Sequence, residues 1–416
     1  MNQPVRVLLV AYGGGHVPMM LPVMKALRQR RPDIVLDLMA LTTAYVAARN
    51  AGEKPWQFTD LKHLADPAFV DEWGARLAPQ QRHPDVSDEE TRAYVGVNFW
   101  DLVQQHGLEA AKKLHASHER FAYLPLHFFR RVLGHFKPDV VVATVSPRSE
   151  EAALQVAVEA GIPTVSMTDF YLRVFDPYCK RSVYADRVTV VNEQVRQTLE
   201  DCGVPPGNLM VTGNPAFDSL ADPECRRTAQ AFRERQGWRD KTVVMWAGHL
   251  DDYTTIRPDP VKATDYPLQV EAELRRWVDA ADDRALIIRY HPNEMHWFPP
   301  GPEHPRIFTS TRAQHVHEAV LAADLVVVQM STVGLEAAVA GKPVVAMVNS
   351  PHALRVDFNY EKLGVAYAAP EVALLAQVID RALREGCVDP ALARREPAAP
   401  VIAAEILSLA GRGSRI

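Results

Sequence analysis

Short apolar runs alternate with segments of helical periodicity along most of this chain. In the first half the apolar runs are Val5–Val10, Ile34–Met39, Val140–Thr144, Thr164–Met167 and Arg187–Val191. In the second half they are Thr242–Trp246, Ala285–Arg289, residues 324–328 and the run that starts at Val344. Continuous apolar runs of this length are typical of parallel strands that are buried on both faces. The segments between them with helical spacing are residues 19–30, 149–160, 193–202, 224–236, 268–281, 332–340 and 371–385. The order predicts an α/β protein built on parallel sheets.

The alternation breaks between residues 50 and 135, a region rich in Trp, His and charge. Helical spacing near 100–116 and 119–135 predicts a largely helical insertion there. We interpret this insertion as the part of the protein that binds an acceptor substrate. A helical cap with a purely structural role explains the pattern equally well. A chain of 416 residues exceeds one ordinary core. We therefore expect a first domain at 1–220, a second at 221–390 and a helical tail at 391–416, which we expect to pack back on the first domain.

Composition excludes several classes of protein. With 47% hydrophobic and 23% charged residues the chain is globular, and a formal net charge of −5 argues against nucleic acid as a partner. No apolar run approaches the length of about 18 residues that spans a membrane, and the start lacks a signal-peptide pattern. Four cysteines without CxxC spacing indicate reduced thiols. We expect a cytoplasmic protein, and peripheral contact with the inner membrane stays open, as does its oligomeric state.

The stretch from Met330 to Val345, MSTVGLEAAVAGKPVV, carries the clearest chemistry. A buried strand at 324–328 leads through a polar turn into a short helix that Gly341 closes. Ser331 and Thr332 stand where a helix N-cap belongs, so free N–H groups and the positive end of the helix dipole favour an anion there. The carboxyl end of a strand is where open α/β sheets bind ligands. Glu336 lies one turn further on and suits ribose hydroxyls.

The segment Glu336-Ala-Ala-Val-Ala-Gly341-Lys-Pro343 resembles the donor-binding signature of GT-B glycosyltransferases. STVGLEA…GKPV is especially similar to bacterial capsule and Kdo transferases and to the hydrolysing UDP-N-acetylglucosamine 2-epimerases. The resemblance implies an α/β fold of two Rossmann-like domains that face each other across an interdomain cleft. It also implies a nucleotide-sugar donor, UDP- or CMP/CDP-linked, bound by Ser331, Thr332, Gly334 and Glu336. The alternative is a helix cap followed by a solvated carboxylate.

In the first domain, the turn Gly13-Gly14-Gly15-His16 follows the first strand. Three glycines let the backbone approach a ligand closely, and a neutral imidazole with an ordinary pKa is a usable base. The turn resembles that of the peptidoglycan N-acetylglucosaminyltransferase and the monogalactosyldiacylglycerol synthases, whose matching His activates or orients the acceptor. The alternative is a tight turn with a capping His. Asp169 follows the end of another strand and is a reserve base, as are Glu150 and Glu151.

In the second domain, His291-Pro292-Asn293 ends a strand. It is similar to the His-Pro motif of CMP- and CDP-dependent capsule transferases and to the HPN segment of the epimerases, where a His assists the leaving phosphate. We expect His291 and Asn293 at the donor, although a polar turn would give the same residues. Gly248 and His249 follow the first strand of this domain and are expected to close over the diphosphate.

Two departures from these families bear on mechanism. Retaining GT-B enzymes carry a second Glu in front of the ribose Glu, and this chain has Val328 there, which favours inversion. The epimerases open with a GTRPE-like turn, whereas this chain has AYGGGH. No DxD or His/Cys ligand spacing occurs, so we expect no bound metal and no separate cofactor. The sequence thus predicts an inverting glycosyltransferase with a cell-surface glycan, lipid or small-molecule acceptor. An epimerase-like isomerase and a non-catalytic nucleotide-sugar-binding subunit are the alternatives.

Overall fold

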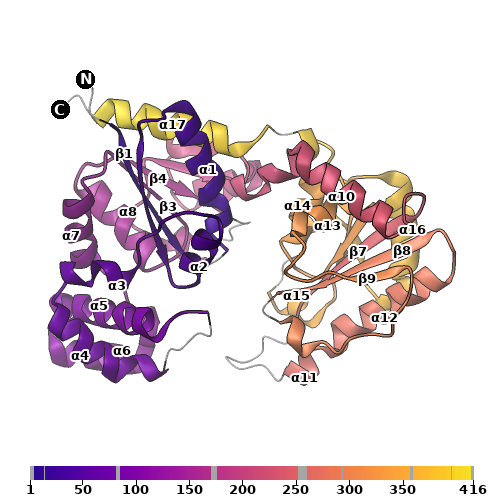
Figure 1. Ribbon diagram of the computed structural model, residues 1–416, viewed down its shortest axis with the longest axis horizontal. Helices are drawn as coiled ribbons and strands as arrows, with labels where there is room; N and C mark the ends of the chain where they lie inside the picture. Colours follow the sequence, from indigo (N-terminus) through magenta and orange to yellow (C-terminus); the bar gives the residue numbers. More distant parts are fainter. Residues whose placement is uncertain are drawn as a thin grey trace. The chain divides into compact units, whose positions relative to one another are not determined.

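A computed structural model describes residues 4–13, 15–80, 85–169, 176–251, 260–292, 294–356, 359–394 and 396–413. The chain forms two compact units (Figure 1). Unit 1 comprises Met1–Asp218 and Pro397–Ile416, and unit 2 comprises Ser219–Glu396. The polypeptide therefore passes between the units twice, near Asp218 and near Pro397. No helix among the described residues is long and apolar enough to span a membrane.

Unit 1 contains a six-stranded parallel sheet in the order β2-β1-β3-β4-β5-β6. Its strands are β1 (Arg6–Tyr12), β2 (Val35–Leu41), β3 (Val140–Thr144), β4 (Thr164–Met167), β5 (Arg187–Val190) and β6 (Leu209–Val211). Its helices are α1 (Val17–Arg30), α2 (Thr43–Asn50), α3 (Phe58–Leu61), α4 (Pro67–Leu77), α5 (Asp88–His106), α6 (Leu108–His118), α7 (Leu126–Phe136), α8 (Ser149–Glu159), α9 (Glu193–Asp201) and α17 (Ala398–Gly413). The central strands β3 and β4 are buried along their whole length, and most of their residues are apolar, because helices cover both faces of the sheet.

The C-terminal helix α17 belongs to the core of unit 1. Its apolar residues Ile402 and Ile406 are buried with Met20 and Met24 of α1 and with Leu9 of the sheet. Figure 1 shows α17 beside α1. The start of α17 is fixed by Asp218, whose carboxylate accepts hydrogen bonds from the backbone of Ala398 and Ala399 at 2.7 and 2.8 Å. A carboxylate at this end of a helix satisfies amides that have no partner within the helix.

The insertion of unit 1 is helical, with α3 to α7 gathered together (Figure 1). The predicted continuous helix at 100–116 is wrong, because the chain breaks at Gly107, whose φ is 76°. Helix α5 instead runs from the N-cap Ser87, which accepts from Glu90 N–H at 3.1 Å, and carries three acidic residues in its first turn. These favour a helix start at this point because they complement the dipole.

Unit 2 has a second six-stranded parallel sheet in the order β12-β11-β10-β7-β8-β9. Its strands are β7 (Thr242–Gly248), β8 (Arg284–Tyr290), β9 (Ile307–Thr309), β10 (Leu325–Val328), β11 (Val344–Met347) and β12 (Tyr367–Ala369). Its helices are α10 (Pro223–Arg235), α11 (Pro260–Ala263), α12 (Asp265–Asp279), α13 (Val316–Ala322), α14 (Val333–Val339), α15 (Pro351–Val356) and α16 (Leu375–Glu385). Two parallel α/β sheets with a helical insertion in unit 1 confirm the expected fold class. Helix α13 was not expected.

Candidate functional site

The carboxyl edge of the unit 1 sheet brings together residues that follow β1, β3 and β4. The strand order reverses between β1, whose chain continues to β2, and its other neighbour β3. Such a reversal opens a crevice at the carboxyl ends of the strands, which is where open α/β sheets bind ligands. The turn after β1 carries His16, the loop after β3 leads to Glu150 at the start of α8, and Asp169 follows β4. The three side chains meet at this edge.

The glycine turn gives His16 its position at the start of α1. Gly13 has a φ of 88°, which favours glycine, and its N–H donates to Leu41 at 3.2 Å. His16 N–H donates back to Gly13 at 3.2 Å, and the imidazole does not cap the helix, so it is free to turn towards the sheet edge. A Cβ on Gly15 would meet nothing within 4 Å. Gly14 lies outside the described residues.

Glu150 is a fully buried carboxylate with four donors around it. One oxygen, Oε1, accepts from Tyr12 N–H at 2.5 Å and lies 3.1 Å from His16 Nδ1. The other, Oε2, accepts from Ser146 N–H at 2.8 Å and from the Thr144 hydroxyl. Thr144 Oγ1 also lies 2.7 Å from His16 Nδ1. A buried charge is tolerated only when it is paired and hydrogen-bonded in this way. The carboxylate of Glu150 can therefore act as the counter-ion of a protonated His16.

His16 lies between two carboxylates. Nδ1 faces Glu150, and Nε2 lies 3.4 Å from Oδ2 of Asp169, whose side chain is one-third exposed. Burial by itself lowers the pKa of His16, but the hydrogen bonds with Asp169 and Glu150 and their negative charges outweigh it and raise the pKa to about 10. The expectation of a neutral imidazole at physiological pH is therefore wrong. An imidazolium cannot accept a proton, so the base role passes to Asp169 as a candidate.

This pKa predicts a pH-dependent contribution to stability. Because the folded pKa of His16 lies above the ordinary value of 6.5, its charge stabilises the folded state fully below pH 6.5, and this stabilisation is lost as the pH rises through about 10. Each pKa unit between the folded and the ordinary pKa of His16 corresponds to about 1.4 kcal/mol in the free energy of unfolding. The difference in free energy of unfolding between the wild type and His16→Gln should shrink steadily across this interval. Urea unfolding of both proteins at several pH values between 6.5 and 10 measures it, and a constant or growing difference would contradict it.

In unit 2 the loops after β7 and β10 are tied together by His249. Its Nδ1–H donates to Leu250 O at 2.7 Å, and its Nε2 accepts from Met330 N–H at 3.3 Å. Burial lowers the pKa of His249, so the ring is neutral, with both nitrogens engaged. This corrects the expectation that His249 closes over a diphosphate: a buried ring whose two nitrogens already have partners holds the loops and leaves no donor for a phosphate.

Close packing within unit 2 explains the two glycines, Gly248 and Gly334, that the sequence predicts at the donor. A Cβ on Gly248 would lie 2.7 Å from the indole nitrogen of Trp246. A Cβ on Gly334 would lie 3.0 Å from Val328 Cγ2 and 3.1 Å from the Tyr360 ring. Separations of this size force a neighbour to move. Gly248 therefore needs glycine for close packing against Trp246, and at Gly334 a side chain would require its neighbours to shift by a few tenths of an ångström, whether or not a ligand binds there.

The polar turn after β10 keeps Ser331 and Thr332 at the start of α14. Ser331 Oγ accepts from Val333 N–H at 3.3 Å, while the Thr332 side chain makes no cap and is exposed. The amides of Gly334 and Leu335 already donate within the turn, at 3.0 and 2.9 Å. Helix α14 has seven residues, so its dipole is weak. The turn therefore offers an anion the hydroxyls of Ser331 and Thr332, whereas the sequence predicted free amides as well.

His291 and Glu336 differ in how open they are. His291 follows β8, its N–H donates to Gly248 O at 2.9 Å, and about half of its side chain (52%) is exposed, with Glu294 4.0 Å away. A ligand at this edge can therefore reach its ring. Glu336 is only 7% exposed, and its Oε2 lies 3.3 Å from His317 Nε2. Asn293 lies outside the described residues.

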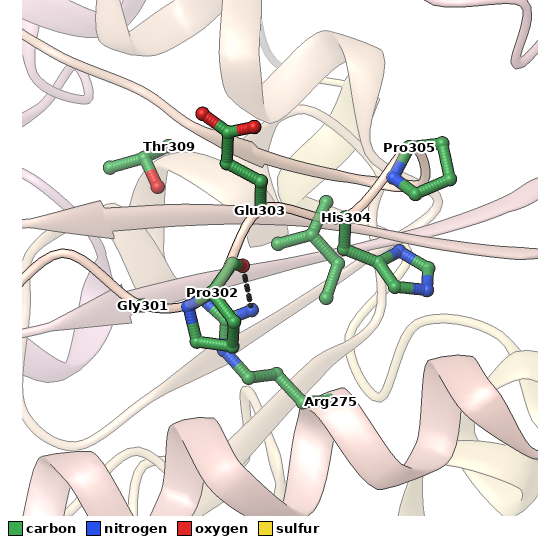
Figure 2. Close-up of a pocket in the computed structure, with 8 residues that line it drawn as sticks. Arg275, Gly301, Pro302, Glu303, His304, Pro305 and Thr309 are labelled. Carbon is green, nitrogen blue, oxygen red and sulfur yellow. Dashed lines mark hydrogen bonds between the residues drawn. The ribbon is translucent and has the colours of Figure 1, made fainter.

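A separate open cavity of about 590 Å³ lies beside the edge strand β9 (Figure 2). Its lining residues are Arg275, Gly301, Pro302, Glu303, His304, Pro305, Ile307 and Thr309. Arg275 closes one side by donating to Pro302 O at 3.1 Å. None of the expected site residues lines this cavity. Most of its lining precedes β9, at the amino edge of the sheet, so it is no candidate for the donor site.

Comparison with known proteins gives one family match and several structures of similar fold. The chain matches the CDP-Glycerol:Poly(glycerophosphate) glycerophosphotransferase family over residues 175–355. A UDP-GlcNAc 2-epimerase structure from Methanocaldococcus jannaschii is 13% identical, with a TM-score of 0.60 over 97% of this chain and 99% of that one. The structure of the wall teichoic acid polymerase TagF is 11% identical, with a TM-score of 0.58 over 99% of this chain and 91% of that one. No curated protein matches at the level of sequence.

The chain has the GT-B fold. The two-domain α/β fold that the resemblance to GT-B glycosyltransferases implied is therefore confirmed. The match at 175–355 contains His291, Ser331, Thr332 and Glu336. The structure of the Neisseria meningitidis UDP-GlcNAc 2-epimerase is 13% identical, with a TM-score of 0.58 over 97% of this chain and 100% of that one, and it is bound to UDP-GlcNAc.

Sequence reasoning missed two residues of this GT-B protein. Thr144 ends a buried strand in the run Val-Ala-Thr-Val-Ser, and a hydroxyl at that place was the only signal. His317 lies on α13, seven residues long, where no periodicity could develop. Its neighbour His315, which accepts from His317 N–H at 3.2 Å, marks the helix start.

Proposed function

We propose that this GT-B protein is a transferase that moves a group from a nucleotide-activated donor to a hydroxyl of a cell-surface glycan. A CDP-linked donor is the first candidate, and a UDP- or CMP-linked sugar is the second. The observation that carries the proposal is the glycerophosphotransferase match at 175–355, which covers the donor candidates of unit 2. The fold that this chain shares with the wall teichoic acid polymerase supports a polymer of the cell surface as acceptor.

The residues of unit 2 suit the donor half of this reaction. The hydroxyls of Ser331 and Thr332 would bind the phosphates. Glu336 would accept hydrogen bonds from ribose hydroxyls. The exposed ring of His291 would donate a hydrogen bond or a proton to the phosphate that leaves.

The residues of unit 1 suit the acceptor half. Asp169 would take the proton of the acceptor hydroxyl, while the adjacent His16 imidazolium, held by Glu150, stabilises the negative charge that builds up nearby. With a CDP-linked glycerol donor, the acceptor oxygen forms a bond to the phosphorus that bears glycerol. The bond from that phosphorus to the bridging oxygen breaks, and CMP leaves. With a sugar donor, attack occurs at the anomeric carbon and the nucleotide leaves.

A UDP-GlcNAc 2-epimerase-like isomerase is the second candidate function. The full-length likeness to several such enzymes favours it. The turn Ala11-Tyr-Gly-Gly-Gly-His16 differs from theirs, which speaks for a transferase. A non-catalytic nucleotide-binding subunit is the third.

Two incubations separate these functions. The purified protein is given CDP-glycerol with a poly(glycerophosphate) acceptor, or UDP-GlcNAc without an acceptor, each with and without EDTA. We expect acceptor-dependent release of CMP that EDTA does not abolish. Release of N-acetylmannosamine would favour the epimerase. In parallel, thermal shift against CDP-, UDP- and CMP-linked donors detects binding, since a ligand at 100 times its Kd adds about 2.7 kcal/mol. Binding without turnover of any donor would favour the subunit.

A further inference from the structure

His317 lies between two oxygens that come from distant parts of the sequence. It is the second residue of α13 and is 5% exposed. Its Nδ1 lies 2.5 Å from Ser219 Oγ, in the 3-10 helix Pro215–Ala221, and its Nε2 lies 3.3 Å from Glu336 Oε2, on α14. The imidazole thus joins two elements that are separated by more than one hundred residues along the chain.

Glu336 depends on this ring. Its Oε2 is buried and makes no aligned hydrogen bond to any described residue, and His317 Nε2 is 3.3 Å away. A buried carboxylate oxygen without a donor is costly. A small rotation of either side chain would complete the bond from Nε2–H. Oε1 would then be left for a ligand, and the carboxylate would be held in one orientation.

Ser219 fixes the orientation of the His317 ring through a hydrogen bond at Nδ1. Because the hydroxyl of Ser219 occupies Nδ1, the other ring nitrogen, Nε2, is the one that faces Glu336. Ser219 is also the first residue of unit 2 along the chain. The preceding Asp218 is bound to the start of α17 in unit 1. His317 therefore contacts both the first residue of unit 2, Ser219, and the carboxylate of Glu336.

We propose that His317 is a positioning residue that orients Glu336 for the ribose hydroxyls of the donor nucleotide, with its own ring held in place by Ser219. The inference rests on the proposed function, because it assumes that Glu336 binds the ribose of the donor nucleotide. His317 touches no substrate itself. It acts by keeping the Glu336 carboxylate available as a hydrogen-bond acceptor in a fixed direction.

Two substitutions of His317 separate its two contacts. The side-chain amide of His317→Asn reaches the position of Nδ1 and keeps the Ser219 contact, but loses Glu336. The amide of His317→Gln reaches the position of Nε2 and keeps a donor to Glu336. Glu336→Gln is the reference variant, and His304→Asn, at the amino edge of the same sheet, is the control. Calorimetry measures binding of CDP and UDP and of their 2′,3′-dideoxy forms to each full-length protein, with thermal melting to verify folding.

We expect the wild type to prefer the ribonucleotide by about ten- to one-hundred-fold, the value of hydrogen bonds to a charged group. Glu336→Gln and His317→Asn should lose most of this preference, while His317→Gln and His304→Asn keep it. If Glu336→Gln loses the preference but a folded His317→Asn keeps it, the positioning role is overturned and the ribose role of Glu336 stands. If His317→Asn does not fold, loss of the preference in His317→Gln overturns the role in the same way. If wild type and Glu336→Gln bind both nucleotide forms alike, the ribose assignment itself fails.

Discussion

Replacing Asp169 with asparagine should lower kcat by about 10²- to 10⁴-fold, the usual contribution of a positioned general base. Asparagine has nearly the same shape as aspartate but cannot accept the proton of an acceptor hydroxyl. The affinity for the donor should not change, because Asp169 lies in unit 1 and the donor candidates lie in unit 2. Steady-state kinetics with saturating donor and varied acceptor measure kcat, and calorimetry with the donor nucleotide measures affinity.

The same variant tests the competing role of His16. Asp169 is one of the two carboxylates that raise the pKa of His16. Its removal should lower that pKa and increase the neutral fraction of the ring at physiological pH. If His16 were the base, Asp169→Asn would raise the activity near neutral pH. Glu159→Gln, an exposed carboxylate on α8, is the control and should change neither quantity.

Replacing Glu150 with glutamine should lower the free energy of unfolding by about 3–5 kcal/mol at neutral pH, as when one partner of a buried ion pair is removed. Both oxygens of Glu150 accept hydrogen bonds, from Tyr12 and His16 on one side and from Ser146 and Thr144 on the other. A glutamine amide would place N–H groups against existing N–H or O–H donors. It would also leave the His16 imidazolium without its buried counter-ion. Urea unfolding at neutral pH, with kinetics on the same preparation, measures both consequences.

Glu159→Gln again serves as the matched control for Glu150. It lies on the same helix and pairs with Arg130 at 2.9 Å, but both side chains are nearly half exposed. A surface ion pair of this kind contributes at most about 1 kcal/mol. A loss for Glu150→Gln that does not exceed the control would show that the carboxylate is not the counter-ion of His16. The argument for an imidazolium would then fail.

The sequence by itself determined the fold class and the two sheets. Apolar runs such as Val140–Thr144 and Val344–Met347 have no polar face, so they are stable only inside a sheet covered on both sides. Helix ends were also readable, because their signals act within one turn: Gly161 and Gly341 both adopt a positive φ after a helix. The donor signature around Glu336 and the turn before His16 could be read for the same reason.

Only the tertiary structure decided what the side chains do. The pKa of His16 depends on Glu150, 134 residues away, and on Asp169. His317 meets Ser219 across 98 residues. Gly248 is required by the Trp246 ring, and His249 is held by Leu250 and Met330. Charge, burial and close contact depend on neighbours in space, whereas periodicity and capping depend on neighbours along the chain.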